Sequence, residues 1–216
     1  MSKIYLIAGL GADTRLYNNI DLHEHDVTPV DWIDPDKSDT LNTYAQKLIH
    51  QYNIVPNSVI IGVSLGGMIT VEIAKQIPVK KAILISSIKT NNEAPGYFNL
   101  FRTLPVYKLI PGKLLTSLGF LVKPMFGQMG EEDAWLFKDM LKNSSPFFIK
   151  WAMEAVLHWK NEIIPPNLYH INGNKDLIFP YKRIHNATAI VNDGTHIMIF
   201  DEAKEVNKLL KAILKK

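Results

Sequence analysis

The residues with the clearest potential for chemistry lie where an apolar run meets a predicted helix. Residues 59–61 (VII) are typical of a buried strand, and the pentapeptide GVSLG follows directly. Its serine, Ser64, has Gly62 two positions before it and Gly66 two positions after it. These glycines leave room for a strained backbone, so the serine hydroxyl can stand clear of a sharp strand-to-helix turn. The N–H groups of the following helix would favour negative charge developing beside that hydroxyl.

Two further candidates, Asp176 and His196, follow predicted strands later in the chain. Short apolar stretches at 169–171 and 187–191 indicate those strands, and a polar loop after each one carries the candidate residue. The carboxyl ends of parallel strands meet at one edge of a sheet, so these two side chains can converge with Ser64. An imidazole can accept the proton of an attacking serine hydroxyl, and a buried carboxylate can fix the tautomer of that imidazole.

The elements that must position these residues alternate between strand and helix. This alternation predicts an α/β fold with a mostly parallel sheet of about six strands, flanked by helices on both faces. Strands are expected at 3–7, 26–30, 59–61, 81–85, 169–171 and 187–191, and helices at 41–51 and 202–214. The first of these helices has Asp39 and Thr40 as candidate caps.

The chain resembles the α/β-hydrolase superfamily over essentially its whole length. The matching motifs are the loop AGLGADTRLY at 8–17, the elbow GVSLGG, the acid segment INGNKDLIFP and the histidine segment NDGTHIMIF. The resemblance implies that Ser64 is the nucleophile, His196 the general base and Asp176 its orienting acid. It also implies that the two N-terminal strands of larger family members are missing here.

The resemblance further implies an oxyanion hole formed by the backbone N–H groups of Leu10 and Leu65. Donors of this kind typically stabilise a tetrahedral oxyanion by about 2.7–4 kcal/mol each. Family members usually carry His-Gly at the first loop, where this chain has Ala8 and Gly9. No cofactor and no metal are implied.

Other polar residues have simpler interpretations. Asp193 could compete for the role of the acid, but Asp176 is favoured because it follows its own strand in the expected chain order. The segment 23–26 (HEHD) resembles a metal clip, yet a solvated loop is the preferred interpretation because coordination needs further ligands. His170 lies within a predicted strand and is interpreted as a core histidine.

Residues 89–165 break the alternation and indicate several helices, including one at 131–142 and one beginning at Ser145-Pro146. This segment holds 12 of the 21 aromatic residues. In the family, an insertion here is a lid, and an aromatic lid implies an apolar pocket and a small-molecule substrate with an apolar portion. The alternative is that the aromatic side chains only pack the lid onto the core. Lys108, Lys113 and Lys123, interleaved with leucines, could touch a membrane surface, but a solvated helix face is preferred.

The composition of the sequence limits the classes of protein to which the chain can belong. A chain of 216 residues that is 47% hydrophobic can bury one sizeable core, so a single domain over 1–216 is expected. A net charge of +3 argues against nucleic-acid binding. The absence of cysteine excludes disulfides and thiolate chemistry and fits a cytoplasmic location. Neither a membrane-spanning helix nor a cleavable signal is expected, because long apolar runs are missing and the first strand begins at Lys3.

Together these features predict a serine esterase or related acyl hydrolase working through an acyl-enzyme. Thioesterases, C–C bond hydrolases and lyases that keep the same three residues remain open as alternatives. A small-molecule receptor with a vestigial triad is an alternative of a different class. The oligomeric state is not indicated by the sequence.

Overall fold

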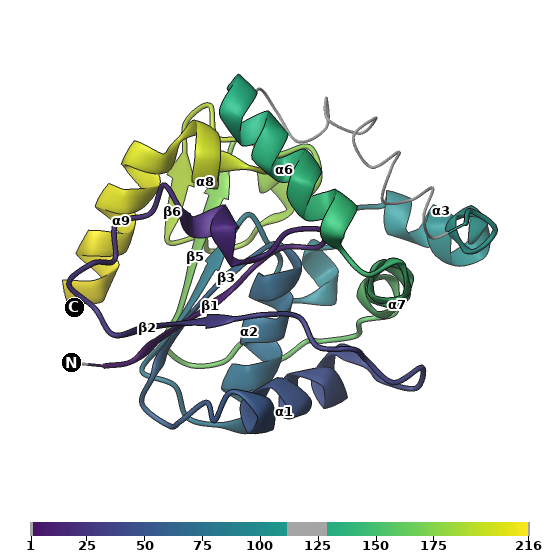
Figure 1. Ribbon diagram of the computed structural model, residues 1–216, viewed down its shortest axis with the longest axis horizontal. Helices are drawn as coiled ribbons and strands as arrows, with labels where there is room; N and C mark the ends of the chain where they lie inside the picture. The colour runs from purple at the N-terminus through teal and green to yellow at the C-terminus, as the bar shows by residue number, and fades with distance from the viewer. Residues whose placement is uncertain (1, 112–128, 216) are drawn as a thin grey trace.

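A computed structural model describes residues 2–111 and 129–215. In this part of the chain six strands form one sheet in the order β2-β1-β3-β4-β5-β6, and every neighbouring pair is parallel. The strands are β1 Ile4–Ile7, β2 Val27–Val30, β3 Val59–Val63, β4 Lys81–Ile85, β5 Leu168–Gly173 and β6 Ala189–Val191. The predicted fold class and strand number are therefore confirmed (Figure 1).

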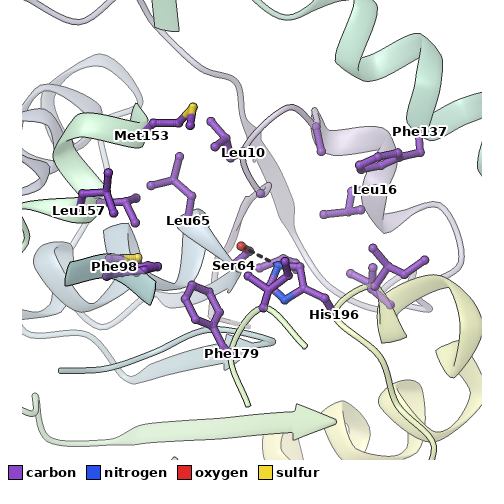
Figure 2. A pocket seen from close by; sticks show the side chains of 18 of the residues that line it. Leu10, Leu16, Ser64, Leu65, Phe98, Phe137, Met153, Leu157, Phe179 and His196 are labelled. Carbon is purple, nitrogen blue, oxygen red and sulfur yellow. Dashed lines mark hydrogen bonds between the residues drawn. The ribbon is translucent and has the colours of Figure 1, made fainter. Parts of the chain in front are cut away.

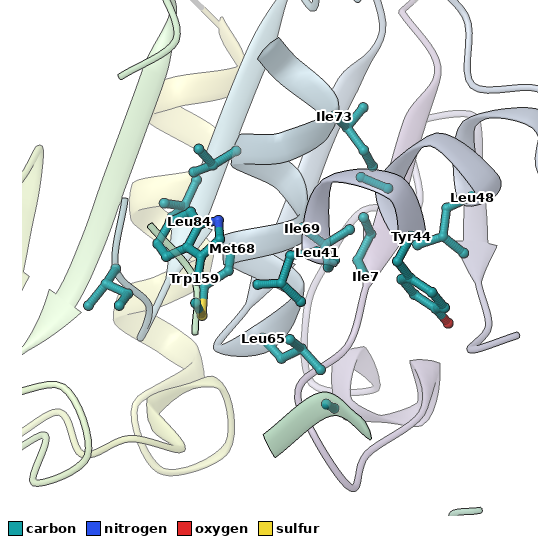
Figure 3. Packing of buried hydrophobic residues seen from close by; sticks show 14 of the residues in the cluster. Ile7, Leu41, Tyr44, Leu48, Leu65, Met68, Ile69, Ile73, Leu84 and Trp159 are labelled. Atoms are coloured by element: carbon teal, nitrogen blue, oxygen red, sulfur yellow. The ribbon is translucent and has the colours of Figure 1, made fainter. Parts of the chain in front are cut away.

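Helices cover both faces of this sheet because successive strand residues point to opposite sides. Tyr5 and Ile7 pack with α1 (Leu41–Gln51) and α2 (Leu65–Gln76) in one buried cluster, part of which Figure 3 shows. The intervening strand residues pack with α8 (Met198–Asp201) and α9 (Ala203–Lys215) in a second cluster. The core is thus two apolar layers separated by the sheet.

Local signals in the sequence account for several element ends. Thr40 caps α1 through a capping box with Thr43, as the predicted cap requires. The C-terminal helix, expected at 202–214, is α9 and begins one residue later, at Ala203. The last strand, expected at 187–191, begins at Ala189, since the Thr188 hydroxyl accepts the N–H of His170 at this end of the strand.

The segment between β4 and β5 contains helices, as expected. In residues 89–111 and 129–165 they are η2 Asn91–Glu93, α3 Tyr97–Thr103, η3 Val106–Lys108, α6 Glu131–Asn143 and α7 Pro146–Leu157. The Ser145 side chain caps α7 by accepting the N–H of Phe148. Figure 1 shows α3, α6 and α7 gathered beyond the carboxyl ends of the strands.

The lysine and leucine group proposed for that segment is only partly described. Lys108 forms an ion pair of 2.7 Å with Glu154 of α7. Lys113, Lys123, their neighbouring leucines, Phe120 and Phe126 lie outside the described residues. Across residues 2–111 and 129–215, none of the helices has both the length and the apolar character needed to cross a bilayer.

Candidate active site

Ser64, His196 and Asp176 come together at the carboxyl edge of the sheet. His196 Nε2 lies 3.0 Å from Ser64 Oγ, and Nδ1 lies 3.1 and 3.0 Å from the two oxygens of the Asp176 carboxylate (Figure 2). A carboxylate only accepts hydrogen bonds, so Nδ1 carries the hydrogen and Nε2 offers its lone pair to the serine hydroxyl. This is the arrangement in which an imidazole can remove the serine proton.

The turn that presents Ser64 is strained. Its φ of 53° and ψ of −115° fall outside the regions that non-glycine residues favour, at a cost of about 1–3 kcal/mol. Close backbone packing holds this conformation. A Cβ at Gly62 would lie 2.2 Å from the carbonyl oxygen of Gly66, and a Cβ at Gly66 would lie 2.3 Å from that of Ile7. Glycine is therefore required on both sides of the serine.

Asp176 is only 2% exposed, and its buried charge is compensated by the loop that carries it. The backbone N–H groups of Ile178 and Phe179 each donate to Oδ1 at 2.8 Å. These two N–H groups satisfy carboxylate lone pairs that burial would otherwise leave without a donor. The ring of Phe179 also packs edge-on against His196, with centroids 5.4 Å apart. The loop that carries Asp176 therefore holds the carboxylate in place and also packs the Phe179 ring against the His196 imidazole.

The acid and histidine loops are packed against each other at two glycines. A Cβ at Gly173 would lie 2.0 Å from the carbonyl oxygen of Gly194. That same oxygen accepts the N–H of Lys175 at 2.9 Å, and Val191 O accepts the N–H of Asn174 at 3.0 Å. Neither Gly173 nor Gly194 was predicted as a site residue, although each glycine closely follows a predicted strand in the sequence.

Asp193, the alternative acid, points elsewhere. Its side chain is 69% exposed and forms an ion pair of 2.8 Å with Lys175. The backbone at Asp193 has φ 61°, the left-handed conformation of a tight turn. Asp176 is therefore the carboxylate that contacts His196.

The two residues whose backbone N–H groups are predicted to bind an oxyanion, Leu10 and Leu65, line the same cavity as Ser64. Leu65 is the first residue of α2, where helix geometry leaves N–H groups unbonded. The first loop passes close by, because a Cβ at Gly9 would lie 3.4 Å from Ser64 Cβ. Among the residues that the structure describes, neither the Leu10 nor the Leu65 N–H has a hydrogen-bond acceptor.

A cavity of about 360 Å³ opens above Ser64. Apart from Ser64 and His196, the described residues that line it are apolar or glycine, except for Tyr97. The Tyr97 hydroxyl donates to Ile178 O at 2.8 Å, and burial raises the pKa of this phenol. In Figure 2, Phe98, Met153 and Leu157 lie on one side of Ser64, while Leu16 and Phe137 lie on the other. The serine therefore stands between two apolar walls.

The remaining candidates have structural surroundings. His170 is fully buried, as predicted for a core histidine, and its Nε2 donates to Ser87 O at 2.9 Å. In the segment 23–26, His23 is exposed and contacts Asp21. Within residues 2–111 and 129–215, no group of three or more His, Cys, Asp or Glu is arranged to hold a metal ion.

Comparisons with solved structures agree with this architecture. The structure is similar to the esterase EaEST from Exiguobacterium antarcticum (TM-score 0.76, 18% identity, 100% of this chain and 92% of that chain). It is also similar to a hydrolase from Pseudomonas aeruginosa PA01 (0.78, 16%, 100% and 90%) and to MenH from S. aureus (0.76, 16%, 99% and 93%). No family model and no curated protein sequence matches the chain.

These neighbours and the sheet topology define the fold. The chain has the α/β-hydrolase fold, in a form with six parallel strands and a helical segment between β4 and β5. The resemblance drawn from the sequence motifs is confirmed at the level of the fold.

Proposed function

We propose that the protein is a serine hydrolase that cleaves small, partly hydrophobic esters through a covalent acyl-enzyme. The observation that supports this most directly is the chain of hydrogen bonds from Ser64 Oγ through His196 to Asp176, located at an apolar cavity. Serine is a weak nucleophile until a positioned base takes its proton, and this arrangement supplies that base.

The proposed reaction has two halves. Ser64 Oγ attacks the ester carbonyl carbon while His196 Nε2 takes the hydroxyl proton, and the N–H groups of Leu10 and Leu65 stabilise the oxyanion. Nε2 then gives its proton to the departing alkoxide, which leaves as the alcohol. A water, deprotonated by the same nitrogen, attacks the acyl-enzyme and releases the acid and the free serine.

Proton delivery also orients the substrate. The leaving oxygen must lie within hydrogen-bond reach of His196 Nε2, so the alcohol portion extends along the wall of Leu16 and Phe137 beside that ring. The acyl portion then extends along the opposite wall, formed by α3 and α7. Among the described lining residues none carries a permanent charge, which favours an uncharged acyl chain.

The proposal is tested by labelling with a fluorophosphonate probe, read by intact mass. Wild type should take up one adduct and Ser64→Ala none. Ser58→Ala is a matched control because Ser58 is buried and its hydroxyl has no hydrogen-bond partner among the described residues. Turnover of a p-nitrophenyl ester in Ser64→Ala should fall to the residual level left by binding and the oxyanion hole.

Two results would overturn the proposal. Full labelling of Ser64→Ala would mean that another residue is the nucleophile. A folded wild type that takes up no adduct and turns over no ester or thioester, yet is stabilised by apolar ligands, would indicate a binding protein with an inactive triad.

A further inference from the structure

A buried ionic cluster lies behind the nucleophile turn and takes no part in the proposed reaction. Lys89, Glu93 and His170 are only 3%, 1% and 0% exposed. The Lys89 ammonium contacts the Glu93 carboxylate and lies 3.5 Å from His170 Nδ1. Glu93 also accepts the backbone N–H groups of Lys89 and His185, each at 2.9 Å. The carboxylate is therefore satisfied by several donors at once.

The surroundings of His170 fix its tautomer. Its Nε2 lies 2.9 Å from Ser87 O, and a carbonyl only accepts, so the hydrogen is on Nε2. Nδ1 then presents a lone pair to the Lys89 ammonium. Burial and the charge of Lys89 lower the pKa of His170 to about 4, which keeps the ring neutral near pH 7. The His170 imidazole therefore connects the Lys89–Glu93 ion pair to Ser87, which follows β4.

Ser87 carries this linkage to the nucleophile. Its Oγ donates to the backbone carbonyl of Ser64 at 2.7 Å. The same side chain packs on the first turn of α2, because a Cβ at Gly67 would lie 2.5 Å from Ser87 Cβ. The carbonyl that Ser87 holds belongs to the strained residue itself, so its position affects where the Ser64 hydroxyl points.

We propose that His170, held by the Lys89–Glu93 pair, is a positioning residue for the nucleophile and acts through Ser87. The inference rests on the proposed function, since it assigns a role in aiming Ser64. Burying an ion pair is costly, and apolar residues of similar volume often give equal or greater stability. The benefit of this cluster is then geometric: it orders Ser87 against a turn that would otherwise relax. A small misplacement of a reacting group can lower a rate by about 100-fold.

The test compares two adjacent serines that are both fully buried. Ser87→Ala removes the hydrogen bond to Ser64 O, whereas the hydroxyl removed by Ser86→Ala has no hydrogen-bond partner in the described part of the chain. Ser87→Ala should lower kcat and the fluorophosphonate labelling rate by about 10- to 100-fold with KM nearly unchanged. Ser86→Ala should stay within about twofold of wild type. His170→Leu should lower kcat like Ser87→Ala, and His170→Gln, which keeps a donor near the Nε2 position, should restore most of it.

Separate outcomes decide the two proposals. A labelled wild type with an equally fast Ser87→Ala, or with equal losses in Ser86→Ala, would overturn the positioning role and leave the hydrolase proposal standing. If a folded wild type is neither labelled nor active on any ester or thioester, the hydrolase proposal fails. Amide hydrogen exchange of residues 62–68 then tests the positioning role, which predicts faster exchange in Ser87→Ala and His170→Leu than in Ser86→Ala. Equal exchange in these variants would overturn it.

Discussion

His196 Nδ1 lies within 3.1 Å of both carboxylate oxygens of Asp176, although 20 residues separate the two in the chain. They follow neighbouring parallel strands, β5 and β6, whose loops touch at Gly173 and Gly194. The contact between acid and imidazole is therefore a direct product of strand order. It also gives the two candidate acids, Asp176 and Asp193, very different expected roles.

Asp176→Asn should lower kcat by about 10⁴-fold, because an amide in place of the carboxylate favours the wrong imidazole tautomer. Asp193→Asn should leave kcat within about twofold of wild type, since its side chain is exposed and pairs only with Lys175 among the described residues. Steady-state kinetics on a p-nitrophenyl ester measure both. A silent Asp176→Asn together with an inactive Asp193→Asn would reverse the assignment.

Gly62→Ala should destabilise the fold by at least about 1–3 kcal/mol, because the added methyl group would meet the Gly66 carbonyl oxygen at 2.2 Å. Gly130→Ala is the matched control, since a Cβ there meets no atom of the described residues within 4 Å. Urea unfolding followed by circular dichroism compares the two. Equal midpoints would show that the turn relaxes around a side chain and that glycine is not required there.

Met153→Trp should narrow the wall assigned to the acyl portion and so shift the enzyme toward shorter acyl chains. The ratio of kcat/KM for an octanoyl ester to that for an acetyl ester should fall by at least about 10-fold, since a lost methylene contact alone costs about 10-fold or more. Phe137→Trp narrows the other wall and should instead select against bulky alcohols at constant acyl length. If Phe137→Trp changed the preference for acyl length and Met153→Trp did not, the two portions of the substrate would be exchanged. The acyl portion would then lie along the wall of Leu16 and Phe137, and the alcohol portion along the wall of α3 and α7.

The depressed pKa of His170 predicts a pH-dependent stability. Burial and Lys89 lower this pKa to about 4, against the opposing charges of Glu93 and Asp176. Below about pH 6.5 the unfolded chain binds a proton at this ring, whereas the folded chain binds it only near pH 4. The free energy of unfolding should therefore fall between pH 6.5 and 4, by up to about 1.4 kcal/mol per pH unit, and gain no slope from this group above 6.5.

Urea unfolding of wild type and His170→Gln at pH 7, 6 and 5 measures this contribution as a difference in slope. Other groups that titrate in the same range contribute to both proteins and cancel. The wild type should lose stability more steeply than the variant as the pH falls. Parallel curves would mean that His170 is protonated alike in the folded and unfolded chains.

The strands and the three candidate residues could be predicted because their signals are local. Apolar runs, glycine spacing and chain order lie within short windows around Ser64, Asp176 and His196. The structure brings these side chains together, and their catalytic roles stay predictions.

The cluster behind the nucleophile turn could not be predicted in this way. Lys89 and His170 are 81 residues apart, and only the pairing of β4 with β5 makes them neighbours. The contact between Gly173 and Gly194 likewise depends on two loops that no local pattern relates. The start of the last strand, expected at 187, lies at Ala189, next to the Thr188 hydroxyl that accepts the N–H of His170.

The helices between β4 and β5 have one more consequence. They supply much of the cavity wall, through residues such as Phe98, Met153 and Phe137, but none of the three side chains in the serine–histidine–aspartate chain. Much of the cavity wall and the serine–histidine–aspartate chain are thus encoded in separate stretches of sequence. Under the proposed function, changes within α3, α6 or α7 would alter substrate selectivity while Ser64, His196 and Asp176 keep their geometry.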